Sequence, residues 1–185
     1  MTEIKDWAMS VKEIRLPRWE DLPELSLYLD QVLEYVNDNI SAVFIEPVSS
    51  NSKQVLTDSM INNYVKNKLM PAPVKKRYQK DHIAFIITIT ILKQVATLSS
   101  VSRGIQHMKL TFGKIKAYNL FIDFLENALK VMTEQLEKTP DEAYFIQPID
   151  YNLLPMKTAT LAFASKMMSE YLLKEIHNIT KENKE

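Results

Sequence analysis

The sequence has no cysteine and only two glycines, Gly104 and Gly113, among its 185 residues. The absence of cysteine excludes disulfides, thiolate metal sites and a cysteine nucleophile, and it is typical of proteins in the reducing cytoplasm. Two isolated glycines cannot build the glycine-rich phosphate loops GxGxxG or GxxxxGK. We therefore predict a cytoplasmic protein, and we expect no cofactor.

The sequence also lacks a long apolar segment. Its longest uncharged apolar run, residues 83–92, has ten residues, whereas a helix that crosses a bilayer needs about 20. Residues 1–15 mix both charges and contain no apolar core, so they do not resemble a signal peptide. With 46% hydrophobic and 25% charged residues, the composition predicts a soluble globular protein with a substantial core and no membrane partner.

Positive charge is concentrated in one segment, although the chain as a whole is neutral, with 23 lysines and arginines against 23 acidic residues. Residues 59–80 contain five lysines, one arginine and no acidic residue. A basic turn beside a short polar helix is typical of helix-turn-helix proteins that bind DNA with a wing. This segment is therefore the first candidate for function.

Apolar residues recur at three- and four-residue spacing along most of the chain, which predicts an all-α fold with at most a small two-stranded wing. The first helix is expected to begin near Pro23, because proline is favoured at the first helical position. Its outer face carries Asp30, Glu34 and Asp38. A polar loop is expected at 45–54. Further helices are expected at residues 57–68, 80–98, 99–108, 118–136 and 161–179, with a capping box at 139–142.

The pattern of segment 80–98 is ambiguous. Its β-branched run Ile-Ile-Thr-Ile-Thr-Ile at 86–91 favours a strand. The length of the segment and the spacing of its apolar residues favour a helix. We predict a helix, followed by a further helix that Ser99 or Ser100 caps.

Residues 57–68 form the candidate recognition helix, which Thr57 or Asp58 can cap by accepting hydrogen bonds from free backbone N–H groups. Four apolar residues are expected to form its buried stripe: Ile61, Tyr64, Val65 and Leu69. Its outward residues are all polar, and none is acidic: Ser59, Asn62, Asn63, Lys66 and Asn67.

Two prolines end this helix and stiffen a basic turn at residues 71–78. Lys75, Lys76 and Arg77 either contact phosphate from this turn or form a solvated basic loop; beside the polar helix we favour phosphate contact. Tyr78 either packs beneath the turn or donates a hydrogen bond to phosphate.

Catalytic and metal signatures are weak in this sequence. His82, His107 and His177 have no partner at metal-ligand spacing on one helix. No GxSxG signature is present. We therefore predict neither a metal site nor an enzyme.

The segment 57–103 carries, in order, Thr57, Ile61-Asn62-Asn63-Tyr64, Leu69-Met70-Pro71, Lys76-Arg77-Tyr78 and a long apolar stretch. This order resembles the winged helix-turn-helix of the MerR family, which has a polar cap, Ile-Arg-Tyr-Tyr, a Leu-Leu-Pro turn, a basic wing ending in tyrosine and a long apolar helix. The family's arginine and first tyrosine are replaced here by two asparagines. Asparagine can pair bidentately with adenine in the major groove.

Three longer stretches are LPRWEDLPELSLYLDQVLEYVN at 16–37, MINNYVKNKLMPAPVKKRY at 60–78 and ILKQV at 91–95. Together they resemble a bacterial family known only as a domain of unknown function, which carries this MerR-like element. The resemblance covers residues 16 to about 105. It implies a DNA-binding transcriptional regulator, whose target and small-molecule effector it leaves open.

We predict three parts of the chain: an N-terminal arm at 1–18, a MerR-like DNA-binding domain at 19–108 with an added N-terminal helix, and a helical C-terminal domain at 109–185. Trp7 and Trp19 are the expected anchors of the arm. Because transcription factors of this type bind as two-fold dimers, the C-terminal helices are expected to form a homodimer, with double-stranded DNA as partner. The predicted DNA-contacting residues are Ser59, Asn62, Asn63, Lys66, Lys68, Lys75, Lys76, Arg77 and Tyr78.

Two other classes of function stay open. The first is a protein-interaction module that keeps the helix-turn-helix fold without binding DNA. The zero net charge and the acidic face of the first helix favour it, because that face would repel nearby DNA. The second is a small enzyme, for which no residue pattern argues.

Overall fold

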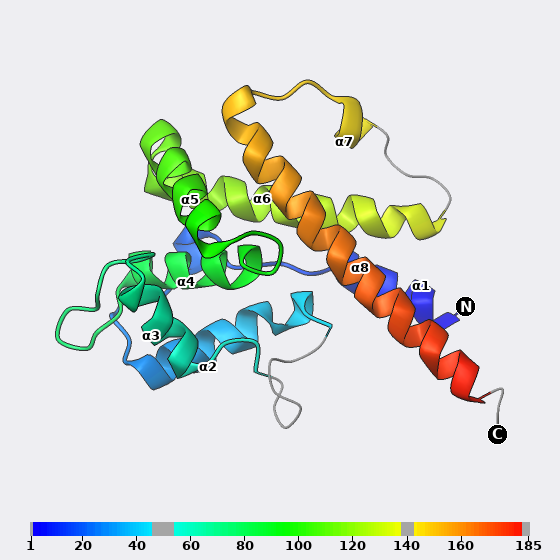
Figure 1. Ribbon diagram of the computed structural model, residues 1–185, viewed down its shortest axis with the longest axis horizontal. Coiled ribbons are helices and arrows are strands. Elements are labelled where there is room, and N and C mark those ends of the chain that lie inside the picture. Colours follow the sequence, from blue (N-terminus) through cyan, green and yellow to red (C-terminus); the bar gives the residue numbers. More distant parts are fainter. Residues whose placement is uncertain (1, 46–53, 138–142, 183–185) are drawn as a thin grey trace.

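The computed structural model describes residues 2–45, 54–137 and 143–182 of the chain (Figure 1). Within these residues the regular structure is helical, and two isolated antiparallel bridges are the only pairing of extended segments. The predicted all-α class is therefore confirmed. The α-helices are α1 Thr2–Lys12, α2 Leu29–Ile40, α3 Asp58–Lys66, α4 Lys80–Leu92, α5 Leu98–Phe112, α6 Lys114–Glu134, α7 Ala143–Ile146 and α8 Leu154–Glu182.

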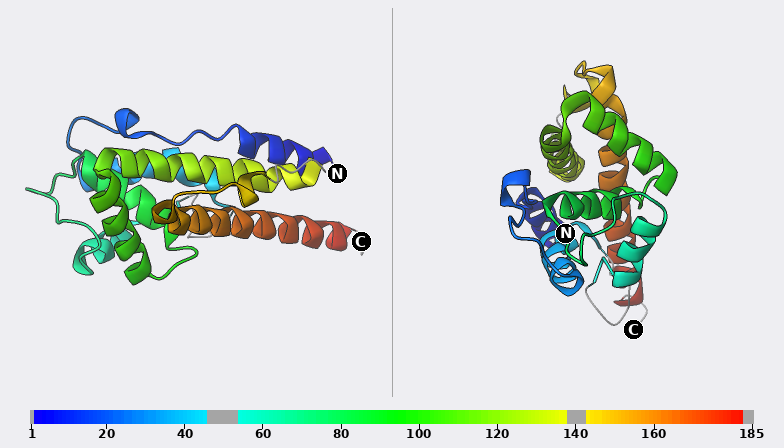
Figure 2. Two further views of the ribbon diagram at one scale, coloured as in Figure 1. Left: turned by 90° about the horizontal axis from the view of Figure 1, so that it is seen from above. Right: turned by 90° about the vertical axis from the view of Figure 1, so that its left-hand side faces the viewer.

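The molecule is elongated, and α6 and α8 run along its long axis (Figure 2). Helix α1 lies beside α6, so the beginning of α1 and the end of α8 lie at the same end of the molecule. The segment that joins α3 to α4 projects at the opposite end. None of the described helices combines the length and apolar character that a membrane span requires.

The predicted N-terminal arm contains a helix. Ala8 and Val11 of α1 are buried, with exposed fractions of 1% and 3%, because apolar residues three apart form one face of a helix. The two expected anchors are in place. Trp7 stacks on Tyr171 of α8 with ring centroids 3.9 Å apart, and Trp19 is buried edge-on against Tyr118 of α6.

The prediction that the first helix begins near Pro23 was wrong, because α2 begins at Leu29. The chain before α2 is extended and pairs with the end of the basic turn. The N–H of Leu27 donates to the carbonyl of Tyr78, and the N–H of Tyr78 donates back, both at 2.8 Å. The Gln31 side chain then accepts from the N–H of Tyr28 at 2.9 Å and caps the helix start.

Helix α4 resolves the ambiguous segment as a helix that is shorter than predicted. It ends at Leu92, and the following turn leads to Thr97, whose hydroxyl accepts from the N–H of Ser100 at 3.2 Å. Thr97 therefore caps α5, in place of the predicted Ser99 or Ser100. Helix α5 continues beyond the predicted Met108 to Phe112, and Gly113 follows with φ 77° and ψ 158°, a conformation that only glycine adopts readily.

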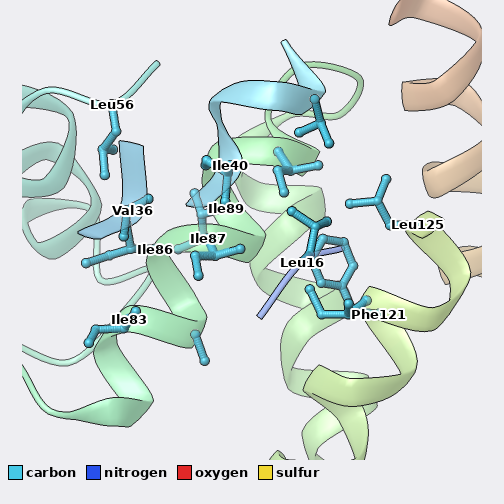
Figure 3. Packing of buried hydrophobic residues seen from close by; sticks show 14 of the residues in the cluster. Leu16, Val36, Ile40, Leu56, Ile83, Ile86, Ile87, Ile89, Phe121 and Leu125 are labelled. Carbon is cyan, nitrogen blue, oxygen red and sulfur yellow. The ribbon is translucent and has the colours of Figure 1, made fainter. Parts of the chain in front are cut away.

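The isoleucines of α4 lie at the centre of the hydrophobic core (Figure 3). Ile83, Ile86, Ile87 and Ile89 are fully buried. Val36 and Ile40 of α2 pack on one side and Phe121 and Leu125 of α6 on another. A helix that is apolar all round is stable only when its neighbours surround it, which explains why this β-branched run is helical. One contiguous cluster extends from Val11 to Met167.

The last part of the chain is helical, as predicted, with different boundaries. Helix α6 packs against both α8 and α1. Helix α8 begins at Leu154 and ends at Glu182, so it is longer at both ends than the predicted 161–179. The predicted capping box at 139–142 and most of the predicted loop at 45–54 lie outside the described residues.

Candidate functional site

Helix α3 lies near the projecting end of the molecule (Figure 1), and its exposed face is polar. Thr57 is its N-cap, and its hydroxyl accepts from the N–H of Met60 at 3.4 Å. Ile61, Tyr64 and Leu69 are buried as predicted, with exposed fractions of 0%, 1% and 7%, while Val65 is half-buried against the core. The polar residues on the outer side are all exposed: Ser59, Asn62, Asn63, Lys66 and Asn67.

Tyr64 belongs to the core, as the sequence indicated. Its hydroxyl lies 3.3 Å from that of Thr90 on α4, so a hydrogen bond ties α3 to the central helix. Burial raises the pKa of Tyr64 to about 12. The ammonium of Lys93 lies 5.5 Å from the centroid of the Tyr64 ring, and burial lowers the pKa of that lysine.

The side chain of Asn37 on α2 sets the position from which α3 begins. Its carboxamide oxygen accepts from the N–H groups of Val55 and Leu56 at 2.8 and 3.0 Å. Its amide nitrogen donates to the carbonyls of Leu56 and Leu33 at 3.0 and 2.8 Å. This one side chain of α2 therefore binds both the N–H and the carbonyl of Leu56, shortly before α3 begins. Sequence reasoning did not identify this residue.

The two asparagines on α3 differ in their availability. The amide of Asn67 donates to the side-chain oxygen of Asn63 at 2.7 Å, so one of the two groups needed for bidentate pairing is engaged. Within the described residues, the side chain of Asn62 forms no such bond. Asn62 is therefore the better placed of the two to pair with an external donor and acceptor.

The basic turn has a tight tip formed by two lysines. Lys75 and Lys76 have φ of 49° and 61°, and the N–H of Arg77 donates to the carbonyl of Val74 at 2.9 Å. Positive φ at both central residues is the feature of a type I′ turn, which normally takes Asn-Gly or a similar pair. Both lysine side chains are exposed, so the turn projects them into solvent.

Lysines carry all the positive φ values of non-glycine residues in the part of the chain that the structure describes. The third is Lys68, with φ 57°, at the end of α3. A residue other than glycine in this conformation has a backbone energy that is higher by about 1–3 kcal/mol, and such residues are frequent at functional sites. The backbone at all three positions favours glycine or asparagine, so propensity does not explain the lysines.

Arg77 is engaged in the packing of the turn. Its guanidinium lies 4.0 Å from the ring centroid of Tyr28, donates to the Tyr28 hydroxyl at 2.9 Å and donates to the carbonyl of Ser26 at 3.2 Å. The residue is nevertheless exposed. Among the described residues, no ion pair involves the four lysines of this surface, Lys66, Lys68, Lys75 and Lys76.

Tyr78 packs beneath the turn and has an exposed fraction of 4%. Its ring lies edge-on to that of His82, with centroids 5.8 Å apart, and burial raises its pKa. His82 itself caps the start of α4 by accepting from the N–H of Gln79 at 3.0 Å. Of the nine predicted contact residues, eight are exposed at this end of the molecule and Tyr78 supports them from below.

Negative and apolar side chains also lie near this surface. Asp58 is exposed in the first turn of α3. Leu25 and Val74 are exposed by 82% and 62%, on the two segments that the Leu27–Tyr78 bridge holds together. Lys80 pairs with Glu24 in the same region, so it is not among the available cations.

The fold and this surface define an all-helical protein with a short polar helix and a tight basic turn exposed side by side at one end. Residues 17–124 match the family described as a domain of unknown function, DUF1836. That match covers more than half of the chain, and the protein belongs to this family. No curated protein and no solved structure matches the chain.

Proposed function

We propose that the protein is a DNA-binding regulator whose α3 enters the major groove while residues 71–78 contact the phosphate backbone. The observation that carries this proposal is the joint exposure of a polar helix face and four lysines without ion pairs among the described residues. Three of those lysines are exposed in a backbone conformation with positive φ, which has a cost in backbone energy.

The shape of α3 is compatible with the groove. An α-helix with its side chains is about 10–12 Å in diameter, and the major groove is about 12 Å wide. Asn62 is the residue we assign to base recognition, because both halves of its carboxamide are available to adenine. Ser59 and Asn63 are placed for contacts beside it.

The lysines supply the electrostatic part of binding. Lys66, Lys68, Lys75 and Lys76 would neutralise up to four phosphates, which corresponds to a slope of about −3.6 in a plot of log K against log salt concentration. Arg77 contributes mainly by holding the turn against Tyr28, and Tyr78 by packing below it. The MerR-like winged helix-turn-helix is the architecture we propose for residues 19–108, with the bridge between Val74 and Arg77 as a minimal wing.

A second copy of the chain is part of this proposal, because one short helix contacts too few bases for sequence specificity. The exposed apolar residues Leu173 and Ile176 on α8, at 62% and 59%, support a homodimer through the C-terminal helices. We propose that the protein acts by binding rather than by catalysis, and in the cytoplasm, where a chain without cysteine is at no disadvantage.

Fluorescence anisotropy with sheared genomic DNA across a salt series tests the function, followed by selection of enriched fragments. The test variant is Lys75→Glu/Lys76→Glu. The matched control is Lys5→Glu/Lys116→Glu, which changes net charge equally with two exposed residues on α1 and α6. We expect salt-sensitive binding to an enriched, roughly palindromic sequence by the wild type and the control, and at least tenfold weaker binding by the test variant. Equal affinities of the two variants would refute the proposed interface.

A protein-interaction module is the second candidate, and the exposed Leu25 and Val74 favour it. Large exposed apolar side chains are more typical of a protein contact than of a phosphate contact. The acidic face of α2, with Asp30, Glu34 and Asp38 exposed, points the same way. In the assay above, absence of DNA binding even at low salt would make this candidate the leading one.

A further inference from the structure

Helices α4, α5, α6 and the start of α8 surround a pocket of about 270 Å³. Its walls are mainly apolar and include Phe85 and Leu92 of α4, Phe121 of α6 and Met156 of α8. Such a pocket lies apart from the basic turn and α3, none of whose residues line it. Apolar pockets with a few polar groups at the edge are the usual form of small-molecule sites in proteins.

Gly104 is the most informative residue of this pocket. It lies in the middle of α5 and lines the pocket. Glycine is less favourable than alanine inside a helix, and the backbone at this position has no positive φ that would require it. A Cβ added there would meet no atom within 4 Å, so close packing does not require it either. The effect of the glycine is to leave the pocket open.

The volume sets the size of a possible ligand. An apolar cavity of about 150 Å³ holds benzene. A pocket of about 270 Å³ therefore has room for a larger molecule, such as a substituted aromatic ring or a medium-length acyl chain. The apolar walls exclude strongly polar ligands, because their groups would lose water without gaining partners.

The charged groups on the lining favour an anion. Lys114 and Asp81 form an ion pair with N–O distances of 3.0 and 2.9 Å, so their charges balance. His107 has a ring nitrogen 3.2 Å from the carbonyl of Asn152. Within the described residues, Lys109 has no ion pair or side-chain hydrogen bond. Among the described residues, the one unbalanced charge on the lining is therefore positive.

We propose that this pocket binds a small apolar molecule that carries one carboxylate, with its apolar part against Gly104 and its carboxylate near Lys109. The class includes arylalkanoic and medium-chain fatty acids. This ligand site does not depend on DNA binding, because its walls and its charge are separate from α3 and the basic turn.

Tryptophan fluorescence gives a direct test. The chain has two tryptophans, and Trp19 lines the pocket while Trp7 stacks on Tyr171. The variant Trp7→Phe keeps an aromatic ring on α1 and leaves Trp19 as the only reporter. In this background we would titrate 4-phenylbutyrate and octanoate, with 4-phenylbutanol and acetate as uncharged and non-apolar controls.

We expect saturable changes in Trp19 fluorescence with both acids, at least fivefold weaker binding of the alcohol, and no response to acetate. Gly104→Leu fills the pocket and should weaken binding of the acids at least tenfold. Gly104→Ala is the matched control, which should keep binding and raise the melting temperature. Lys109→Ala should remove the preference for the acid over the alcohol.

Ala159→Met, from the α8 side of the same pocket, repeats the filling test if Gly104→Leu does not fold. Absence of saturable binding by either acid would overturn the proposal. Unchanged affinity in a folded filling variant would do so too, because the acids would then bind elsewhere. Equal affinity for acid and alcohol would overturn the carboxylate assignment.

Discussion

The tip of the basic turn has two lysines in backbone conformations that favour asparagine or glycine. Substitution of these lysines therefore gives a sharp prediction. Lys75 and Lys76 have φ of 49° and 61°. A residue with a Cβ costs about 1–2 kcal/mol in the left-handed region, whereas Asn-Gly is the preferred pair for a type I′ turn. The variant Lys75→Asn/Lys76→Gly should therefore relieve most of this cost at both positions.

The expected gain follows from the two contributions. Relief at both positions is partly offset by the entropy that glycine adds to the unfolded chain, about 0.5–1 kcal/mol. The net increase in the free energy of unfolding should be about 1–3 kcal/mol. For a chain of this length each kcal/mol raises the melting temperature by roughly 2–4 °C, so we expect an increase of roughly 2–12 °C.

The same variant should bind DNA less well. Loss of two phosphate contacts would reduce the magnitude of the salt slope by about 1.8. The control is Lys75→Ala/Lys76→Ala, which removes the same two charges but keeps side chains in the left-handed conformation. Urea denaturation followed by circular dichroism measures stability, and anisotropy measures binding.

We expect only the Asn-Gly variant to be more stable than the wild type. We expect both variants to lose the same amount of DNA affinity. If the Asn-Gly variant is no more stable than the Ala-Ala variant, the reasoning from backbone strain is refuted. If both variants bind DNA as the wild type does, the turn does not contact phosphate, whatever its backbone costs.

Two further predictions concern the groups that hold α3 in place. Asn37→Ala leaves two partly buried N–H groups before α3 without their acceptor. Since each unsatisfied group costs about 1–3 kcal/mol, the free energy of unfolding should fall by about 2–6 kcal/mol. A loss below about 1 kcal/mol in urea denaturation would contradict the role of this side chain. Burial raises the pKa of Tyr64 from 10.0 to about 12. Because the folded state holds this proton more tightly, the stabilisation is complete below pH 10 and is lost as the pH rises towards 12, by about 2–3 kcal/mol. Tyr64→Phe should therefore lose less stability over this pH range than the wild type, and equal losses would contradict the assignment.

The sequence predicted α3 closely because its signals are local. An apolar stripe at three- and four-residue spacing, a threonine cap and two prolines after the helix lie within about fifteen residues of one another. The exposure of Ser59, Asn62, Lys66 and their neighbours follows from the same periodicity. Tyr64 was assigned to the core for this reason, and the structure confirms it.

The sequence did not predict features that depend on distant residues. Helix α2 begins after Pro23 because Leu27 pairs with Tyr78, and no local rule reports a contact across that separation. The hydrogen bonds of Asn37 to Val55 and Leu56 are of the same kind. The positive φ of the lysines was not predicted either, because the usual glycine or asparagine signature is absent at these positions.

The positions of the two chain ends also determine how the protein would respond to mechanical force. Helix α1 begins and α8 ends at the same end of the molecule, and Trp7 stacks on Tyr171 between them. A force applied between the ends would separate these two helices one contact after another, before it reached α2, α3 and α4. The part of the chain that carries the basic turn would thus be the last to experience the load.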